Sequence, residues 1–309
     1  RDWSSDVCSS DLRMLADLGK ATVAIDRLHA VLDAAPEDAG DAVRGADDHA
    51  PLPTGGVRFE GIRFAYPGGP PVLDGVDIAV GPGETVAIMG PSGCGKSTLL
   101  SLLLRLRDPD AGRITVSGQD IRTLDRRRLR ARIASVLQPP FLYSRTIREN
   151  VAIDRASTGQ EALAAAAEGA AVHDAVLRFQ RGWDTVVGER GITLSGGQRQ
   201  RLAIARALLR PADVLVLDDA LSAVDQATER RILDAMRARR GTAPTIVVAH
   251  RLSTLAEADR IVVLEHGRVA DQGTHAELVA RDGLYRRLWA IQAELEEEER
   301  AALAGEGHA

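Results

Sequence analysis

The sequence has 309 residues, 45% hydrophobic and 27% charged, with a formal net charge of −5 at pH 7. This balance is typical of a globular protein with a sizeable core and excludes a wholly disordered chain. The acidic balance gives no reason to expect nucleic acid as a partner. No run approaches the ~18 apolar residues of a membrane-spanning helix. The two cysteines, Cys8 and Cys94, are too few for a disulfide framework or a zinc site.

The N-terminal region divides into three segments. Residues 1–12 resemble the translation of a sequencing adapter, and the alternative is a flexible arm rich in Ser and Asp. We set them apart from the fold and expect the natural N-terminus to be missing. Residues 13–34 carry apolar side chains at helical spacing, which predicts an amphipathic helix. Residues 35–55, rich in Ala, Asp, Gly and Pro, predict a linker.

Residues 56–292 predict one domain of mixed α/β type. Short apolar runs alternate there with helical stretches, which predicts a mostly parallel sheet covered on both faces. Residues 57–66 alternate apolar and polar positions, with a change of phase at Gly61, and begin a β subdomain. Residues 139–205 predict an inserted helical subdomain, and the charged tail at 293–309 is interpreted as a solvated helix end. The predicted strands of the sheet are 85–89, 133–137, 214–217, 245–249 and 261–264.

A glycine-rich segment at 90–98 follows an apolar strand and opens a helix, as a phosphate-binding loop requires. Glycines let backbone N–H groups turn toward phosphate oxygens, and a helix start favours an anion. Lys96 supplies a compact ammonium for the β- and γ-phosphates, and Ser97 offers a hydroxyl to Mg²⁺. The alternative is a chance glycine-rich turn. The nucleotide-binding candidates here are Gly90, Ser92, Gly93, Gly95, Lys96, Ser97 and Thr98.

Two further segments support nucleotide binding. The apolar run at 214–217 ends in Asp218, which predicts a carboxylate on the Mg²⁺ side of the site. Residues 194–198, Leu-Ser-Gly-Gly-Gln, open a helix and predict a second phosphate-binding end. One nucleotide cannot use two distant ends of one chain, so we expect a head-to-tail dimer. Ser195 and Gly197 would then reach the γ-phosphate held by the other copy.

Six ordered motifs resemble the nucleotide-binding domain of ATP-binding-cassette (ABC) transporters over residues 56–292. The resemblance implies an α/β fold: a P-loop NTPase core with a parallel sheet, an N-terminal antiparallel β subdomain and an inserted helical subdomain. It also implies ATP and Mg²⁺ as ligands and a second ABC ATPase domain as partner. The motifs are the loop at 90–98, Gln138, the signature at 194–198, the strand at 214–218, Ser222-Ala-Val-Asp225, and His250.

The resemblance assigns roles to single residues. Tyr66 would stack on adenine, with ordinary core packing as the alternative. Gln138 would sense Mg²⁺ or the attacking water, His250 would contact the γ-phosphate, and Asp225 would bridge the dimer interface. The catalytic candidates are Lys96, Gln138, Asp219 and His250, the Mg²⁺ candidates are Ser97, Gln138 and Asp218, and the residues acting in trans are Ser195, Gly197 and Gln198.

Two segments resemble exporter-type half transporters. They are residues 146–150, after Gln138, and residues 187–191, which in that subclass touch the intracellular loops of the membrane domain. The helix at 13–34 is similar to the cytosolic end of the last transmembrane helix. The resemblance therefore implies a transmembrane domain as partner and a location at the cytoplasmic face of the plasma (inner) membrane.

Asp219 departs from the family pattern, which usually has Glu at this position to orient and activate water. A base must lie within hydrogen-bond reach of its water, and a misplacement of ~1 Å can cost ~10²-fold in rate. We therefore expect slow or absent hydrolysis by this chain alone, unless backbone adjustment restores the reach. Exporters built from two different halves often carry Asp here in one half, beside an intact signature.

The leading hypothesis is the ATPase motor of a multidrug- or lipid-exporter-like half transporter. A regulatory half that binds ATP without turnover is the alternative that rests on Asp219. A non-transport ABC ATPase would be expected to show a second cassette, long coiled-coil insertions or zinc cysteines. An importer subunit usually lacks a helix such as the one predicted at 13–34.

Overall fold

A computed structural model describes residues 4–34, 55–153, 158–188, 194–241, 243–291 and 293–294. The chain divides into two units, residues 1–46 and residues 47–309. The predicted linker at 35–55 and the tail at 293–309 lie almost entirely outside the described residues.

The first unit contains helix α1 (Ser4–Leu32), which spans most of the predicted helix and begins earlier than we expected. Several of its apolar side chains are exposed, among them Leu18 and Leu28. None of the helices in the described part of the chain is both long enough and apolar enough to cross a membrane.

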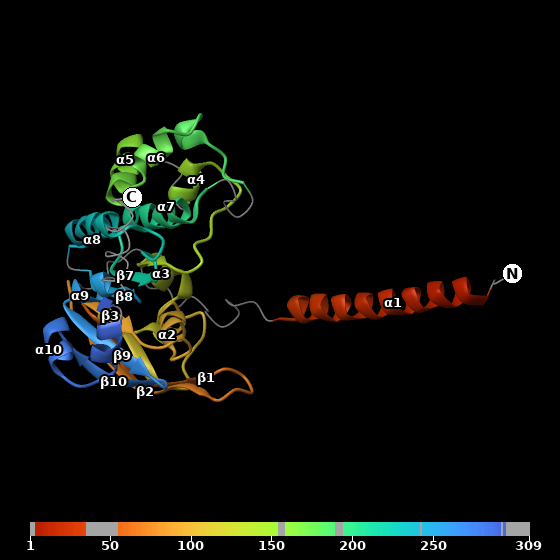
Figure 1. Cartoon of the computed structure of the whole chain (residues 1–309), viewed down its shortest axis with the longest axis horizontal. Coiled ribbons are helices and arrows are strands. Elements are labelled where there is room, and N and C mark those ends of the chain that lie inside the picture. Colours follow the sequence, from red (N-terminus) through yellow and green to blue (C-terminus); the bar gives the residue numbers. More distant parts are fainter. Residues whose placement is uncertain are drawn as a thin grey trace, which may run out of the picture. The chain divides into compact units, whose positions relative to one another are not determined.

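The second unit is built on two sheets (Figure 1). An antiparallel sheet has the strand order β2-β1-β4-β5, and a larger sheet has the order β10-β9-β3-β8-β7-β6. In the larger sheet all neighbours are parallel except β10, which is antiparallel to β9. The strands are β1 (Val57–Ala65), β2 (Pro71–Val80), β3 (Thr85–Met89), β4 (Ala111–Val116), β5 (Gln119–Asp120), β6 (Ile133–Val136), β7 (Val214–Asp218), β8 (Thr245–Val248), β9 (Arg260–Glu265) and β10 (Arg268–Gly273).

The larger sheet is buried on both faces, as its continuous apolar runs predict. In β3, Val86 and Ile88 belong to a core shared with the antiparallel sheet, whereas Ala87 and Met89 belong to a second core shared with the helical subdomain. This alternation follows from the two-residue period of a strand. The predicted fold class is confirmed: a parallel sheet, an antiparallel β subdomain and an inserted helical subdomain.

The change of phase at Gly61 is a β-bulge. The pairing of β1 with β2 shifts after Phe59 and its pairing with β4 shifts after Glu60, and Gly61 takes a φ of 59°. The backbone N–H of Gly61 donates to the Asp77 carboxylate at 2.7 Å. An extra residue in one strand re-aims the side chains that follow, and Ile62 and Phe64 are thereby buried.

Helices cover the larger sheet, and α4 to α7 gather into one group apart from the antiparallel sheet (Figure 1). The predicted helical subdomain at 139–205 contains α4, α5, α6 and most of α7. The helices of the second unit for which bounds are defined are α2 (Lys96–Leu103), α3 (Arg126–Ala131), α4 (Ile147–Val151), α5 (Gln160–Gly169), α6 (His173–Leu177), α7 (Gly196–Leu209), α8 (Gln226–Arg240), α9 (Leu252–Ala256) and α10 (His275–Ala280), with short 3₁₀ turns at Ile121–Thr123 and Gly182–Asp184.

Asn150, fully buried in α4, holds the segment that follows Gln138. Its Oδ1 accepts from the N–H of Tyr143 at 2.8 Å, and its Nδ2 donates to the carbonyls of Tyr143 at 2.9 Å and Thr146 at 3.0 Å. Arg206 of α7 donates to the carbonyl of Asn150 at 2.8 Å. These bonds fasten the segment to α7.

Replacing Asn150 with Leu, which has a similar volume, is expected to destabilise the fold by about 2–4 kcal/mol. The change removes the side-chain hydrogen bonds of Asn150 to the backbone of Tyr143 and Thr146, and it leaves the N–H of Tyr143 without its partner. Arg148→Leu on the same helix is the matched control and is expected to cost less than about 1 kcal/mol, because it removes a surface ion pair to Asp184. Urea unfolding measures both values, and equal losses would contradict the role of Asn150.

Candidate functional site

The phosphate loop joins β3 to α2 and depends on two crowded glycines. A Cβ at Gly90, which has a φ of 155°, would lie 2.0 Å from the carbonyl oxygen of Leu264. At Gly95, with a φ of 106°, it would lie 2.6 Å from Cδ2 of Leu73. Only glycine fits either place. The loop can therefore wrap closely around the start of α2.

Lys96 is the first residue of α2 and is only 7% exposed. Its ammonium donates to the carbonyls of Gly90 at 2.7 Å and Pro91 at 2.9 Å, and lies 3.7 Å from Sγ of Cys94. The charge is thus held at the loop by neutral partners, which a phosphate oxygen can replace with a stronger charge-assisted bond.

Asp218 ends β7 beside this loop and is 8% exposed. Burial raises the pKa of its carboxyl above the usual range, although a hydrogen bond from the Ser97 hydroxyl and the charges of Lys96 and His250 act in the opposite direction. The buried carboxylate is therefore incompletely compensated by the protein alone. A divalent cation would supply the missing positive charge.

The residues predicted for Mg²⁺ offer oxygen ligands, which this ion prefers. Within the described ranges, no three or more His, Cys, Asp or Glu side chains are grouped to hold a metal ion. Ser97, Asp218 and Gln138 would therefore hold Mg²⁺ only together with phosphate oxygens, and this is the usual arrangement for Mg²⁺ at nucleotide sites.

Gln138 and Asp219 meet at the same edge. The side-chain amide of Gln138 donates to Oδ2 of Asp219 at 3.1 Å. Asp219 follows Asp218 directly and has a left-handed φ of 48°, and its N–H donates to the carbonyl of Val248 at 2.9 Å. His250 lies just beyond the end of β8 and is exposed.

Tyr66 follows β1 and is 40% exposed, so ordinary core packing does not describe it. Its hydroxyl lies 3.2 Å from Oγ1 of Thr98 in the phosphate loop, and the ring packs edge-on against Phe64. The guanidinium of Arg107 lies over the ring, 5.1 Å from its centre. The aromatic ring is thus next to the phosphate loop, with part of its surface accessible.

The signature segment caps α7. The Ser195 hydroxyl accepts from the N–H of Gln198 at 3.2 Å, and Oε1 of Gln198 accepts from the N–H of Ser195 at 2.9 Å. This is a capping box, which the Ser-x-x-Gln spacing could have predicted and which we did not foresee. The Ser195 hydroxyl keeps its own proton and remains able to donate to an anion.

The structure brings together only part of the predicted site. The carboxyl edge of the parallel strands brings together the phosphate loop and four further residues, Gln138, Asp218, Asp219 and His250. Within the described residues, no hydrogen bond or ion pair joins Ser195 or Gln198 to the phosphate loop. The signature therefore does not complete the site of its own chain in this structure.

Asp225 caps α8 by accepting from the N–H of Thr228 at 2.9 Å, and this hydrogen bonding lowers the pKa of Asp225. Residues 189–191 of the exporter-like segment lie outside the described residues.

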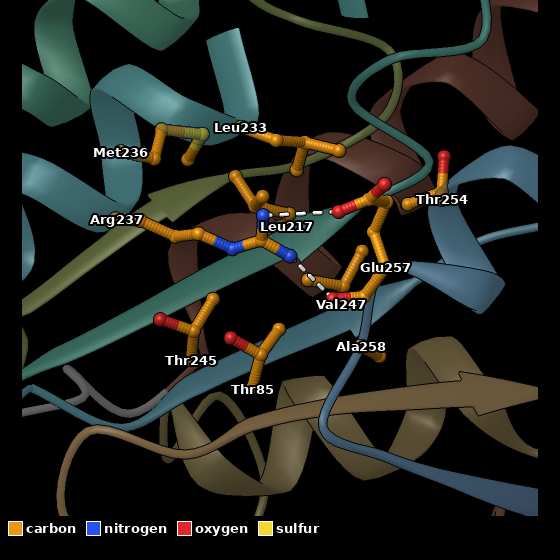
Figure 2. A pocket seen from close by; sticks show the side chains of 10 residues that line it. All are labelled: Thr85, Leu217, Leu233, Met236, Arg237, Thr245, Val247, Thr254, Glu257 and Ala258. Carbon is orange, nitrogen blue, oxygen red and sulfur yellow. Dashed lines mark hydrogen bonds and ion pairs between the residues drawn. The ribbon is translucent and has the colours of Figure 1, made fainter. Parts of the chain in front are cut away.

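A cavity of about 20 Å³ lies between α8, β7 and β8 and the end of α9 (Figure 2). Arg237 and Glu257 form an ion pair across it at 3.0 Å. It has room for about one water molecule. No residue of the phosphate loop lines it, so it is separate from the nucleotide site.

Residues 73–222 match the ABC transporter family. This chain carries an ABC transporter nucleotide-binding domain. It is 47% identical over 237 residues to an ATM1-type heavy metal exporter of Novosphingobium aromaticivorans, covering 77% of this chain and 39% of that protein. It is 46% identical over 276 residues to an ATP-dependent lipid A-core flippase of Chromohalobacter salexigens, covering 88% of this chain and 46% of the flippase.

A solved structure of a bacterial Atm1-family ABC exporter with ATP bound is also similar. Its TM-score is 0.76 at 45% identity, over 79% of this chain and 43% of that one. The chain thus spans less than half the length of each of these relatives.

Sequence reasoning missed a set of polar residues in this nucleotide-binding domain. Gln200 of α7 and Arg251, next to His250, bond to the backbone of residues 219–224, and the buried Glu229 bonds to Arg251. These residues lie between or beside the recognised motifs, and spacing alone gave no reason to single them out.

Asp218→Asn is expected to raise the melting temperature of the nucleotide-free domain at neutral pH by about 2–4 °C, the shift that roughly 1 kcal/mol produces at this size. The change removes a carboxylate whose charged form is penalised by burial. Asp213→Asn, at the other end of β7, is the control and should lower the melting temperature, since Asp213 is paired with Arg132. Calorimetry without Mg²⁺ measures both.

The gain in stability from Asp218→Asn is expected to depend on pH. The folded pKa of Asp218 lies above its unfolded value, so the folded state binds more protons between the two values and wild-type stability falls as the pH rises through that window. The gain from Asp218→Asn should therefore be complete above the folded pKa and disappear as the pH falls toward the unfolded value. A gain that is independent of pH would contradict this cause.

Proposed function

We propose that the chain is the ATP-binding and ATP-hydrolysing motor domain of an ABC exporter, in which ATP-driven closure of a dimer powers export. The observation that carries the proposal is the convergence of Lys96, Asp218 and the Gln138–Asp219 pair at one edge of the sheet. The similar Atm1-family exporter was solved with ATP bound, and other relatives are named exporters or flippases, which supports the same conclusion.

ATP binding begins with the residues around the phosphate loop. The phosphates replace the carbonyls of Gly90 and Pro91 as partners of the Lys96 ammonium, while the loop N–H groups and the start of α2 bind the remaining oxygens. The accessible ring of Tyr66 stacks on adenine. Ser97, Asp218 and Gln138 would hold Mg²⁺ together with the phosphates, and the bound ion would supply positive charge to the transferred phosphoryl group.

Hydrolysis needs a water molecule placed in line with the γ-phosphate. Asp219 is the acceptor that orients this water, and the Gln138 amide, at 3.1 Å, keeps the carboxylate turned toward the site. His250 lies close enough to Asp218 for its charge to lower the pKa of that carboxyl. It is the residue that contacts the γ-phosphate. Lys96 stabilises the charge that develops in the transition state.

A second copy of this or a related domain completes the site. The capped start of α7 offers a hydroxyl proton from Ser195, backbone N–H groups and a helix terminus, all favourable to an anion. In a head-to-tail dimer this end, with Gly197 and Gln198, binds the γ-phosphate of the partner. Asp225 then lies at the dimer interface.

The second partner is a transmembrane domain of the same exporter, because the matched part of this chain covers less than half of each similar transporter. The motor domain then works at the cytoplasmic face of the plasma (inner) membrane. We assign residues 13–34 to the cytosolic end of the last transmembrane helix of that domain, to which they are similar. Closure of the dimer is the two-state element that drives transport, and hydrolysis reopens it.

The second candidate function is a degenerate half of a heterodimeric exporter, which binds ATP and hydrolyses it slowly. Asp219 is the specific observation in its favour, since it is one methylene shorter than the usual Glu while Leu194–Gln198 are unaltered. Such a half still lends its signature to the competent site of a different partner.

The test is the steady-state ATPase rate of the wild type, Asp219→Glu and Lys96→Ala, with ATP binding followed in parallel. In a degenerate half, Asp219→Glu is expected to raise the rate by about 10–100-fold, because the longer side chain restores the reach to water. Lys96→Ala is expected to abolish turnover and to weaken ATP binding.

Asp234→Glu, the same exchange at an exposed position of α8, controls for the added methylene. Ready turnover by the wild type with no gain in Asp219→Glu would reject the degenerate half and favour a homodimeric motor. Failure of the wild type to bind Mg²⁺-ATP would reject both functions.

A further inference from the structure

Tyr66, which we assign to the adenine of ATP, has a different neighbour on each side. The antiparallel sheet has the order β2-β1-β4, so the end of β1 that precedes Tyr66 lies between β2 and β4. The phosphate loop abuts β2, because a Cβ at Gly95 would lie 3.1 Å from the carbonyl oxygen of Val72 and 2.6 Å from Cδ2 of Leu73. A nucleotide held by the loop would therefore approach Tyr66 from the side of β2.

The side of β1 that faces β4 is occupied by a different segment. Residues 104–110, here called the platform loop, connect α2 to β4. Asp110 fastens the end of this loop to β1: its N–H donates to the carbonyl of Arg63 at 2.9 Å, and its carboxylate accepts from the N–H of Ala65 at 2.7 Å. Because Ala65 directly precedes Tyr66, the platform loop ends beside the residue that bears the ring.

The start of the platform loop is held by Arg130 of α3. The guanidinium of Arg130 donates to the carbonyls of Leu104 at 3.0 Å and Arg105 at 2.8 Å. The buried side chain of Arg105 in turn donates to the carbonyl of Leu124 at 2.7 Å. The platform loop is therefore anchored at both ends, and a side chain in its middle has a defined place relative to Tyr66.

Arg107, in the middle of the platform loop, lies over the ring of Tyr66. Its Cζ atom is 5.1 Å from the ring centre, within the ~6 Å over which a cation is attracted to an aromatic face. The acidic residue next to it is engaged elsewhere, since Asp108 pairs with Arg105 at 3.3 Å and with Arg126 at 3.7 Å. Among the residues that the structure describes, Arg107 has no ion pair of its own, so its charge acts on the ring without a carboxylate to neutralise it.

Tyr66 stays exposed despite these contacts. Its hydroxyl lies 3.2 Å from Oγ1 of Thr98, and the ring of Phe64 stands at 84° to its own ring, with the centres 5.0 Å apart. Arg107 covers the ring from the side of the platform loop. The accessible surface is therefore open to a base that enters from the side of β2.

We propose that Arg107 is a positioning residue for the nucleotide base: the base stacks on the face of Tyr66 turned toward β2, while the guanidinium supports the opposite face. This inference rests on the proposed function, in which Tyr66 stacks on adenine. The guanidinium holds the ring in one orientation before ATP binds, which removes part of the ordering cost of binding. Its charge also offsets the negative potential of the ring face, which lowers the repulsion between the ring and the π-electrons of a stacked purine.

The experiment compares Arg107→Gln and Arg107→Lys with the wild type by calorimetric titration of the full chain in the presence of Mg²⁺. The ligands are ATP, GTP and inorganic tripolyphosphate, which has the phosphates without a base. Arg107→Gln removes the charge and keeps a planar amide, and we expect it to weaken the binding of ATP and GTP alike by about 2–5-fold, the strength of an exposed cation–π contact. Arg107→Lys keeps a cation and should recover most of this loss.

Tripolyphosphate separates an effect on the base from general electrostatic attraction. If Arg107 acts through the ring, tripolyphosphate binding should change no more in Arg107→Gln than in Arg113→Gln. Arg113→Gln is the matched control, because it removes the charge of an exposed arginine of β4. In a Tyr66→Ala background, Arg107→Gln should cause no further loss of ATP affinity, since the ring through which it acts is absent.

Four results would overturn the role of Arg107. They are an unchanged ATP affinity, an equal loss for ATP and tripolyphosphate, a loss that persists without the Tyr66 ring, and a loss confined to one purine. The last result would place the guanidinium at the edge of the base instead of behind the ring.

The proposed function can fail separately from this inference. A wild type that binds neither ATP nor tripolyphosphate would reject the proposed function and the inference together. A wild type that binds both ligands equally well would reject base stacking on Tyr66, and the inference with it, while leaving the phosphate site in place.

Discussion

Strands β3, β8 and β7 pair in a register that places Ile88, Val248 and Asp218 side by side. All three strands therefore end at the same level of the sheet. The phosphate loop, His250 and Asp219 each begin within two residues of these positions. Register in a sheet buried on both faces is set by packing, and a slip of one residue would turn every side chain to the opposite face. The site depends on this alignment before any single polar contact is made.

Helix α7 is the second element on which the arrangement depends. Its capped start offers the anion-binding end, while Gln200 and Arg206 extend from its sides to two different loops. Arg206 holds the segment after Gln138, and Gln200 holds the segment after Asp218. The same helix thus has a terminus suited to phosphate and two side chains bonded to segments at this edge of the sheet. A movement of α7 would therefore move both segments.

Much of the fold was predictable because the spacing of apolar residues and the order of the segments can be read directly from the sequence. The apolar strand at 85–89, the loop that follows and the bulge at Gly61 all appear where the pattern places them. The short strand β5 and the edge strand β10 were not predicted, because their residues lack a continuous apolar run and pair only through tertiary contacts.

The same division applies to the site. Lys96, Asp218 and Ser195 stand out by motif, whereas Arg251 and Glu229 lie far apart along the chain and acquire meaning only when they meet. The contact of Gln138 with Asp219 joins residues 81 positions apart, which no spacing rule predicts. Long-range polar contacts of this kind depend on the complete fold, and they are the part of the site that sequence patterns do not contain.

The left-handed backbone conformation at Asp219 limits the side chains that fit at this position. Asp and Asn occupy that region more readily than longer residues, because a short polar side chain can bond locally and clashes less with its own backbone. A longer acid would gain reach toward water and at the same time add conformational strain. In the proposed function, thermal stability and turnover would oppose each other at this residue, and a variant with faster turnover would be expected to be less stable.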